Sequence, residues 1–313
     1  MKPAHALILC LALLVTGCAR PTASPPPRIP EVPVALVDAA PEFEPHVRTA
    51  PVAEAEKPVP QPPAASEQKP PVLQPKLVEP PAQIPVLLYH DLAHGAKGGN
   101  GATVDVAEFE WQMDWLAQNG FTPVTTAELL AWLQGKGQLP PRPVAIQFDD
   151  GYRSNYTHAL PIMKKHGMKG VLFLVSGFPG EEGMVTWAQV KEMAASGSLE
   201  IQGHAHAGHG KTGTAANLVA WDTEQIRADY RAMAESFAGA GLAAPVSFAY
   251  PFGAHDDETV AALRAEGVRA AFTVNHGYVR RGDDPFRLKR LIVWPGMSTC
   301  QFAGLVRGEQ TCP

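Results

Sequence analysis

The stretch AIQFDDGY, residues 145–152, joins a short apolar run to two adjacent carboxylates and a glycine. The apolar run has the length of a buried β-strand, and Asp149 and Asp150 follow where that strand would end. Carboxylates beside a buried strand are costly unless a metal ion, a hydrogen bond or a chemical role compensates them. The pair therefore marks a candidate functional site.

Apolar runs of the same kind recur along the rest of the chain and alternate with amphipathic segments. Two of these segments open with a capping box, at Thr125 and Thr186, which satisfies the first amides of a helix. Strands that alternate with helices in this way predict a parallel α/β architecture, either a barrel or an open sheet. The predicted strands are 84–90, 144–148, 170–175, 199–203, 246–250, 270–274 and 290–294.

Polar residues follow most of these strands at their carboxyl ends, where parallel α/β folds keep their active sites. The fourth strand runs into EIQGHAHAGHG, residues 200–210, which contains His204, His206 and His209. Imidazoles together with a carboxylate suit a divalent ion such as Zn²⁺, with one position left open for water. Of the two adjacent aspartates, one can then bind the metal while the other removes a proton from the water.

The first residues have the composition of an export signal. Residues 1–17 contain one lysine followed by an apolar core too short to span a bilayer. They lead into VTGC, residues 15–18, which resembles a bacterial lipobox and implies cleavage before Cys18 and lipidation of that residue. The alternative is an ordinary signal peptide with a chance cysteine. Ala19 is not the aspartate that usually retains a lipoprotein in the inner membrane. We therefore expect a periplasm-facing anchor, in the outer membrane rather than the inner.

Residues 18–83 are predicted to be a disordered linker that starts at the lipidated cysteine. This part of the chain is rich in Pro, Ala, Glu, Lys and Val, has no apolar periodicity, and contains most of the 31 prolines. Such a composition cannot bury enough apolar surface to fold. The folded domain is then expected over residues 84–313. The formal net charge of -5 and the lack of a basic stripe give no indication of nucleic acid as a partner.

Two cysteines, Cys300 and Cys312, lie near the C-terminus of the predicted folded domain. In an exported protein a disulfide between them would staple the tail, and the alternative is a pair of free thiols.

The stretch QFDDGY, residues 147–152, resembles the TFDDGY motif of the polysaccharide deacetylases, carbohydrate esterase family 4, whose domain is also called the NodB-homology domain. The resemblance covers about residues 84–305. The segments YHDL (89–92), FAYPFG (248–253) and AAFTVNHG (270–277) are similar to the branch that removes N-acetyl groups from poly-β-1,6-N-acetylglucosamine. The resemblance implies a distorted or incomplete (β/α) barrel of the NodB-homology type.

The resemblance also implies roles for individual residues. By position Asp149 would be the general base, and Asp150 the first metal ligand. His204 and His209 would complete the metal site, because their five-residue spacing resembles the exopolysaccharide branch, whereas the commoner pattern has four. The backbone amide of Tyr152 would hold the oxyanion.

The sequence departs from the family pattern in two places. Many members have an arginine where this chain has Ala249, and many have a catalytic histidine near the C-terminus, whereas no histidine follows His276. His276 is a candidate general acid, or only a histidine in a turn. His90 is a second candidate for the acid, or a substrate contact. Arg290 would orient the site, or would be a surface charge. Pro251 and Phe252 are expected substrate contacts, and packing explains Phe252 equally well.

The implied function is metal-dependent hydrolysis of N-acetyl groups on an N-acetylglucosamine polymer, with the poly-β-1,6-linked exopolysaccharide first. Zn²⁺ is the expected metal, and an exopolysaccharide export machinery is an expected partner. One alternative is a peptidoglycan or O-acetyl ester deacetylase of the same fold. Another is a catalytically inactive lipoprotein that only binds glycan.

Overall fold

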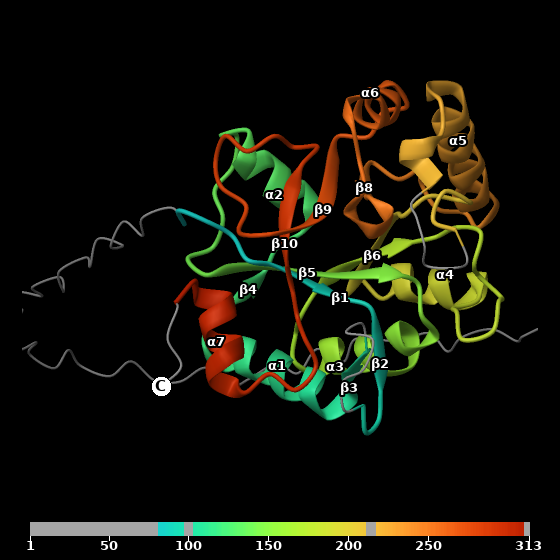
Figure 1. Cartoon of the computed structure of the whole chain (residues 1–313). Helices are drawn as coiled ribbons and strands as arrows, with labels where there is room; N and C mark the ends of the chain where they lie inside the picture. The colour runs from blue at the N-terminus through green and yellow to red at the C-terminus, as the bar shows by residue number, and fades with distance from the viewer. Residues whose placement is uncertain (1–80, 97–102, 211–216, 310–313) are drawn as a thin grey trace, which may run out of the picture. The chain divides into compact units, whose positions relative to one another are not determined.

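The computed structural model describes residues 81–96, 103–210 and 217–309 (Figure 1). The predicted signal peptide, Cys18 and nearly all of the linker lie outside the described residues, and so does Cys312. The strands of the main sheet are β1 (Val86–Tyr89), β4 (Thr122–Pro123), β5 (Pro143–Asp150), β6 (Gly170–Leu174), β7 (Leu199–Gly203), β8 (Ser247–Ala249), β9 (Ala270–His276) and β10 (Leu288–Ile292). A separate two-stranded sheet pairs β2 (Asp91–Ala93) with β3 (Thr103–Asp105).

The main sheet is parallel and closes into a ring. Its strand order is β1-β10-β9-β8-β7-β6-β5-β4, and β1 also pairs with β5, for example at Leu87 and Ile146. Strand β4 pairs only with the first two residues of β5 and stays outside the ring. The (β/α) barrel expected from the sequence is therefore confirmed.

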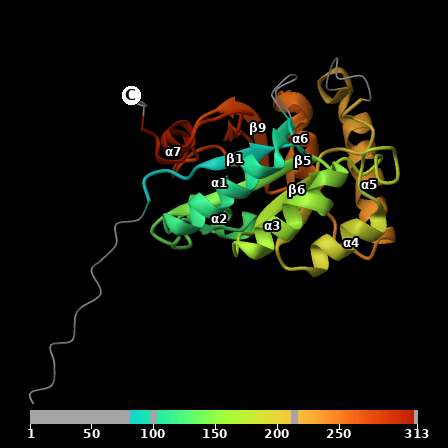
Figure 2. The same cartoon turned by 90° about the horizontal axis from the view of Figure 1, so that it is seen from below.

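Helices pack around the ring, most of them on its outside. They are α1 (Val106–Gln118), α2 (Thr126–Leu133), α3 (Leu160–Lys165), α4 (Trp187–Ala195), α5 (Thr223–Gly239), α6 (Asp257–Ala265) and α7 (Thr299–Arg307). Figure 2 shows α1, α3 and α4 side by side next to β1, β5 and β6. The capping boxes predicted at Thr125 and Thr186 are formed. In the described part of the chain no helix combines the length and the apolar character needed to cross a bilayer.

The strands divide their side chains between two apolar clusters, because successive residues of a strand point to opposite faces. Ile146 and Phe148 of β5 belong to the cluster beneath the outer helices. Ala145 belongs to a second cluster, which joins alternate residues of several strands to the apolar side of α2. Residues 147 and 149 share the parity of Ala145, so β5 directs their side chains to the same inner face.

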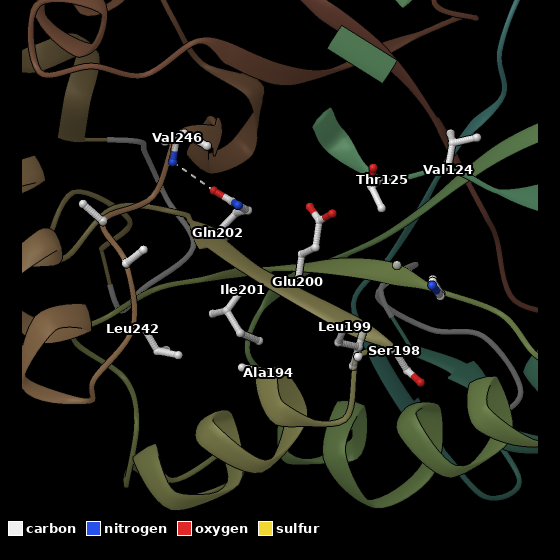
Figure 3. A pocket seen from close by; sticks show the side chains of 15 residues that line it. Val124, Thr125, Ala194, Ser198, Leu199, Glu200, Ile201, Gln202, Leu242 and Val246 are labelled. Atoms are coloured by element: carbon white, nitrogen blue, oxygen red, sulfur yellow. Dashed lines mark hydrogen bonds between the residues drawn. The ribbon is translucent and has the colours of Figure 1, made fainter. Parts of the chain in front are cut away.

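The ring is distorted between β7 and β8, which pair only at Gly203 and Phe248. Below that point the side-chain oxygen of Gln202 accepts hydrogen bonds from the backbone amides of Val246 (3.0 Å) and Ser247 (3.1 Å) (Figure 3). A pocket of about 390 Å³ lies here, at the amino-terminal end of β7, and Glu200 is among its lining residues.

The C-terminal helix α7 carries one of the two cysteines discussed above. Cys300 is disulfide-bonded. Its predicted partner, Cys312, falls outside the described residues, so the pairing stays a prediction.

Candidate active site

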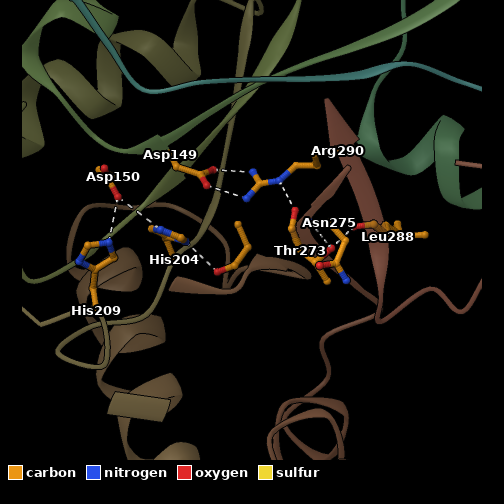
Figure 4. A network of polar contacts seen from close by, with 9 residues as sticks. Asp149, Asp150, His204, His209, Thr273, Asn275, Leu288 and Arg290 are labelled. Atoms are coloured by element: carbon orange, nitrogen blue, oxygen red, sulfur yellow. Dashed lines mark hydrogen bonds and ion pairs between the residues drawn. The ribbon is translucent and has the colours of Figure 1, made fainter. Parts of the chain in front are cut away.

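The two aspartates at the end of β5 point in different directions. Asp149 follows the inward parity of the strand, and both of its carboxylate oxygens accept hydrogen bonds from Arg290, at 2.8 and 2.7 Å (Figure 4). Asp150 would point outward by the same parity, but its φ of 74° lies in the left-handed region. A backbone in this region is costly for a residue with a Cβ atom, so the surrounding structure must hold Asp150 in place.

Arg290 is fully buried in β10. Its Nε also donates to the carbonyl oxygen of Thr273 at 2.8 Å, which fixes the plane of the guanidinium. Burial alone would raise the pKa of Asp149, but the positive charge of Arg290 beside it holds that pKa below its ordinary value. Asp149 is therefore an ionised, oriented carboxylate at neutral pH.

Asp150, His204 and His209 converge at one point. The Oδ1 atom of Asp150 lies 3.3 Å from Nε2 of His204 and 3.1 Å from Nε2 of His209. One ligand atom from each of the three residues falls within 4.8 Å of the others. Burial would raise the pKa of Asp150, but without a metal ion the imidazoles of His204 and His209, when protonated, donate to it and hold its pKa far below its usual range.

The other nitrogen of each histidine faces a backbone carbonyl oxygen. Nδ1 of His204 lies 2.7 Å from the oxygen of Ala249, and Nδ1 of His209 lies 3.0 Å from that of Gly210. A carbonyl only accepts, so these contacts assign the hydrogen to Nδ1 and leave a lone pair on Nε2 of the neutral ring.

When both rings are neutral, the Nε2 lone pairs of His204 and His209 face the same negatively charged oxygen of Asp150. These groups repel one another unless a cation lies between them. Ligands of a tetrahedral Zn²⁺ at about 2.0–2.1 Å lie about 3.3 Å apart, close to the separations from Asp150 to the two histidines. The donor set of Asp150, His204 and His209 therefore fits a divalent metal ion.

His206, the third histidine of this loop, faces elsewhere. Its Nδ1 atom lies 2.9 Å from the hydroxyl of Ser176. The structure therefore separates it from the three converging residues.

Tyr152 forms a bridge with Met184 that leaves its own amide unused. The two hydrogen bonds of this bridge run from Arg153 N–H to Gly183 O (2.8 Å) and from Val185 N–H to the oxygen of residue 151 (3.0 Å). Burial first, and then the charge of Asp150, raises the pKa of the Tyr152 hydroxyl to about 12. The phenol therefore stays protonated, and its backbone N–H is available one residue after the turn.

His90 and Phe252 border this group. Burial lowers the pKa of His90, while the charges of Asp149 and Asp150 partly oppose that effect, so His90 lies within electrostatic reach of both aspartates. The side chain of Phe252 is 43% exposed, and its ring centroid lies 4.7 Å from that of His209. Pro251, in contrast, is buried. An exposed aromatic face thus lies directly beside a candidate metal ligand.

Comparison with known proteins places this constellation in a family. The sequence pattern of the family named Polysaccharide deacetylase matches residues 136–271. YxkH of Bacillus subtilis (strain 168), whose name assigns it to the polysaccharide deacetylases, is 31% identical over 228 residues, which cover 73% of this chain and 77% of YxkH. This chain belongs to the polysaccharide deacetylase family.

Other proteins resemble the chain over a similar range. A poly-β-1,6-N-acetyl-D-glucosamine N-deacetylase of Staphylococcus aureus (strain MRSA252) is 25% identical over 197 residues, 61% of this chain and 68% of that protein. The structure of IcaB from Ammonifex degensii matches with a TM-score of 0.64 and 28% identity, covering 74% of this chain and 99% of IcaB. The Streptococcus pyogenes deacetylase PplD has the same fold, with a TM-score of 0.65, 21% identity and coverage of 74% and 100%.

His276, a candidate general acid, lines a pocket beside α7. His276 is exposed at the end of β9 and lines a pocket of about 580 Å³ together with Tyr278, Met297 and residues of α7. His276 pairs in register with Arg290, whereas His90 lies within electrostatic reach of both aspartates.

Arg290 has the opposite outcome. The sequence left open whether it orients the site or is a surface charge, and the structure buries it against Asp149. Lys289 and Arg290 are adjacent charged residues of β10, and the alternation of the strand exposes Lys289 and buries Arg290.

Proposed function

We propose that this protein is a metal-dependent N-deacetylase of an N-acetylglucosamine polymer, with poly-β-1,6-N-acetylglucosamine as the first substrate. One observation carries the proposal: a metal-type donor set of Asp150, His204 and His209 lies beside Asp149, a second carboxylate held ionised by Arg290. Pure glycan binding has no need for a free base next to such a donor set. The names of the Staphylococcus aureus relatives support the choice of polymer.

The residues divide the work of amide hydrolysis between them. A divalent cation held by Asp150, His204 and His209 would polarise the acetamide carbonyl and lower the pKa of water. Asp149 accepts a proton from the water as its oxygen attacks the acyl carbon. The two hydrogen bonds from Arg290 fix the direction in which that carboxylate presents its oxygens.

The negative charge that develops on the acyl oxygen needs a donor. The backbone N–H of Tyr152, which its bridge with Met184 leaves unused, is available for this role.

Cleavage of the C–N bond also requires a proton on the leaving nitrogen, so that acetate and a free amine result. His90 is neutral at neutral pH because burial lowers its pKa. It can accept the proton from Asp149 and pass it to the nitrogen. The exposed ring of Phe252 offers a face on which a sugar ring can stack next to His209.

For the location we propose a lipid anchor at Cys18 and a proline-rich tether, residues 18–83, with the deacetylase domain facing the periplasm. The lipobox-like sequence and the composition of the tether support this proposal. An outer-membrane anchor would hold the enzyme on the route of an exported polysaccharide, where an export machinery would be its partner.

The decisive experiment measures acetate release from β-1,6-linked N-acetylglucosamine oligomers by the full-length protein. The reactions contain added Zn²⁺ or a chelator, and Asp149→Asn serves as the variant without the base. We expect release that requires both the metal and Asp149. Peptidoglycan fragments and O-acetylated sugars are run in parallel. Release from these alone would overturn the choice of polymer, and no release from any of them with metal bound would overturn the catalytic function.

A further inference from the structure

The loop that carries the candidate ligands His204 and His209 is held by a carboxylate from outside the site. The backbone amides of His206, Ala207 and Gly208 all donate to the side chain of Asp229, at 2.8, 2.7 and 3.0 Å. Asp229 lies on α5 and is only 7% exposed. One buried carboxylate thus collects three consecutive amides of the segment between the two histidines.

This segment has no secondary structure that could satisfy those amides itself, because residues 204–209 form no helix or strand. Buried backbone N–H groups need partners, and successive amides in a turn form a concave site for an anion. The φ of Ala205 is 72°, in the left-handed region, although Ala205 is fully buried. The conformation is therefore costly, and Asp229 supplies a compensating interaction.

The opposite side of the loop is packed closely as well. The amide of Ser176 donates to the oxygen of Ala205 at 3.0 Å. A Cβ atom at position 177 would lie 2.6 Å from the carbonyl oxygen of His206, and one at Gly208 would lie 2.7 Å from the side chain of Leu218. The loop is thus clamped between the β6 connection and the Asp229 carboxylate.

Helix α5 is itself fixed against the barrel. The hydroxyl of Tyr230 donates to the carbonyl oxygen of Pro245 at 2.6 Å. Gly203, the last residue of β7, packs so closely on Met233 that a Cβ atom there would lie 2.7 Å from its sulfur. Helix α5 therefore contacts the loop region twice, through the packing of Met233 on Gly203 and through the carboxylate of Asp229.

We propose that Asp229 is a positioning residue for the metal site: it fixes the loop so that His209 meets Asp150 and His204 in the geometry a divalent ion requires. Asp229 touches neither the three ligands' side chains nor the reacting atoms. The proposal rests on the metal-binding part of the proposed function.

The test compares Asp229→Asn and Asp229→Ala with Glu235→Gln, a change of the same charge at an exposed position of the same helix. In Asp229→Asn an amide NH₂ faces a backbone N–H, so at least one of the three hydrogen bonds is lost. Zn²⁺ affinity is measured by competition with a chromophoric chelator. We expect both Asp229 variants to bind Zn²⁺ about 10–100-fold more weakly, and Glu235→Gln to bind like the wild type. Wild-type affinity in folded Asp229 variants would overturn the proposal.

A second measurement needs no variant, in case the substitutions prevent folding. Hydrogen exchange of the metal-free wild-type protein should show slow exchange at residues 206–208, because their amides are bonded to a buried carboxylate. Fast exchange at all three would overturn the proposal.

Acetate release separates this inference from the function. Weakened metal binding in a protein that releases no acetate would leave the inference standing without the function. Metal-dependent acetate release with unchanged Zn²⁺ affinity in the Asp229 variants would support the proposed function and overturn the positioning role of Asp229.

Discussion

The two ends of the barrel each hold a carboxylate that is largely removed from water, and the pKa values of the two carboxylates shift in opposite directions. Burial raises the pKa of Glu200, which lies at the amino-terminal end (Figure 3). Burial acts on Asp149 at the carboxyl-terminal end in the same way, but the guanidinium of Arg290 reverses the outcome (Figure 4). The largest difference is the buried guanidinium, so charge pairing rather than burial distinguishes the ionised base Asp149 from Glu200.

The backbone shows the same contrast. Among the described residues, the non-glycine positions with positive φ are Asp150, Ala205 and Phe252, and all three follow carboxyl ends of strands around the candidate metal site. The pocket beside Glu200 has a defined volume of about 390 Å³ but no such position among its lining residues. Local strain persists only where the surrounding structure enforces it, which is common at active sites. Strain and paired charge mark the functional end, whereas a cavity alone does not.

Removing the cation should make Asp149 resemble Glu200. Arg290→Met removes the largest interaction that offsets the burial of Asp149 and leaves only the weaker effects of His204 and His90, so the pKa of Asp149 should rise above the ordinary value. We expect acetate release, measured as kcat/KM, to fall by about 10²–10⁴-fold, and the acid limb of its pH profile to move to higher pH. Arg287→Met, at a more exposed arginine of the same segment, is the control. An unshifted acid limb would contradict the comparison.

The same substitution has a signature in stability. In the wild type the pKa of Asp149 lies below its unfolded value of about 3.9, so its contribution is present above that pH and is lost as pH falls through the folded pKa. In Arg290→Met the folded pKa is raised, so stability should fall as pH rises through it. Loss of one partner of a buried pair costs about 3–5 kcal/mol. Urea unfolding between pH 4 and 8 should show a deficit that grows with pH, and parallel curves would contradict this.

The proton donor offers the next largest effect. His90→Ala should lower kcat by about 10²-fold if His90 relays a proton to the leaving amine. His276→Ala should change kcat by less than about twofold, because His276 is exposed and lines a pocket beside α7. Initial rates of acetate release under saturating substrate compare the two variants directly. The reverse ranking would show that β9, rather than β1, supplies the acid.

Strain at the site can be tested through stability. Ala205→Gly keeps the loop but removes the Cβ atom that makes a φ of 72° costly. We expect the free energy of unfolding to rise by up to about 1 kcal/mol, because relief of the left-handed strain outweighs the added freedom of glycine in the unfolded chain. Urea unfolding of the metal-free protein measures this. A loss of stability larger than removal of one buried methyl group explains would show that Ala205 is not strained.

The sequence predicted what lies close together in the chain. The strand ending in Asp149 and Asp150, the helix caps and the parallel α/β class could be read from local patterns, whereas the barrel was implied by the family resemblance. The pairing of Arg290 with Asp149 could not, because it joins positions 141 residues apart.

Asp229 was missed for a related reason, although a signal existed. It lies among Ile226, Tyr230 and Met233 on the buried face of α5, where a carboxylate is out of place. Such a residue indicates a buried partner without identifying it, since the partner here is the backbone of a distant loop.

The smallest expected effect is at the amino-terminal end. The pKa of Glu200 is raised in the folded state, so its contribution favours folding at low pH and is lost as pH rises from the unfolded value of about 4.3 through the raised one. Glu200→Gln should therefore gain stability relative to the wild type at pH 7 but not at pH 4. Water screens this partly open carboxyl, so the gain should stay under about 1 kcal/mol. Acetate release should be unchanged, because Glu200 lies at the opposite end of β7 from His204. A change in kcat/KM of more than about threefold would show that the two ends of the barrel are coupled and that the pocket belongs to the enzyme's function after all.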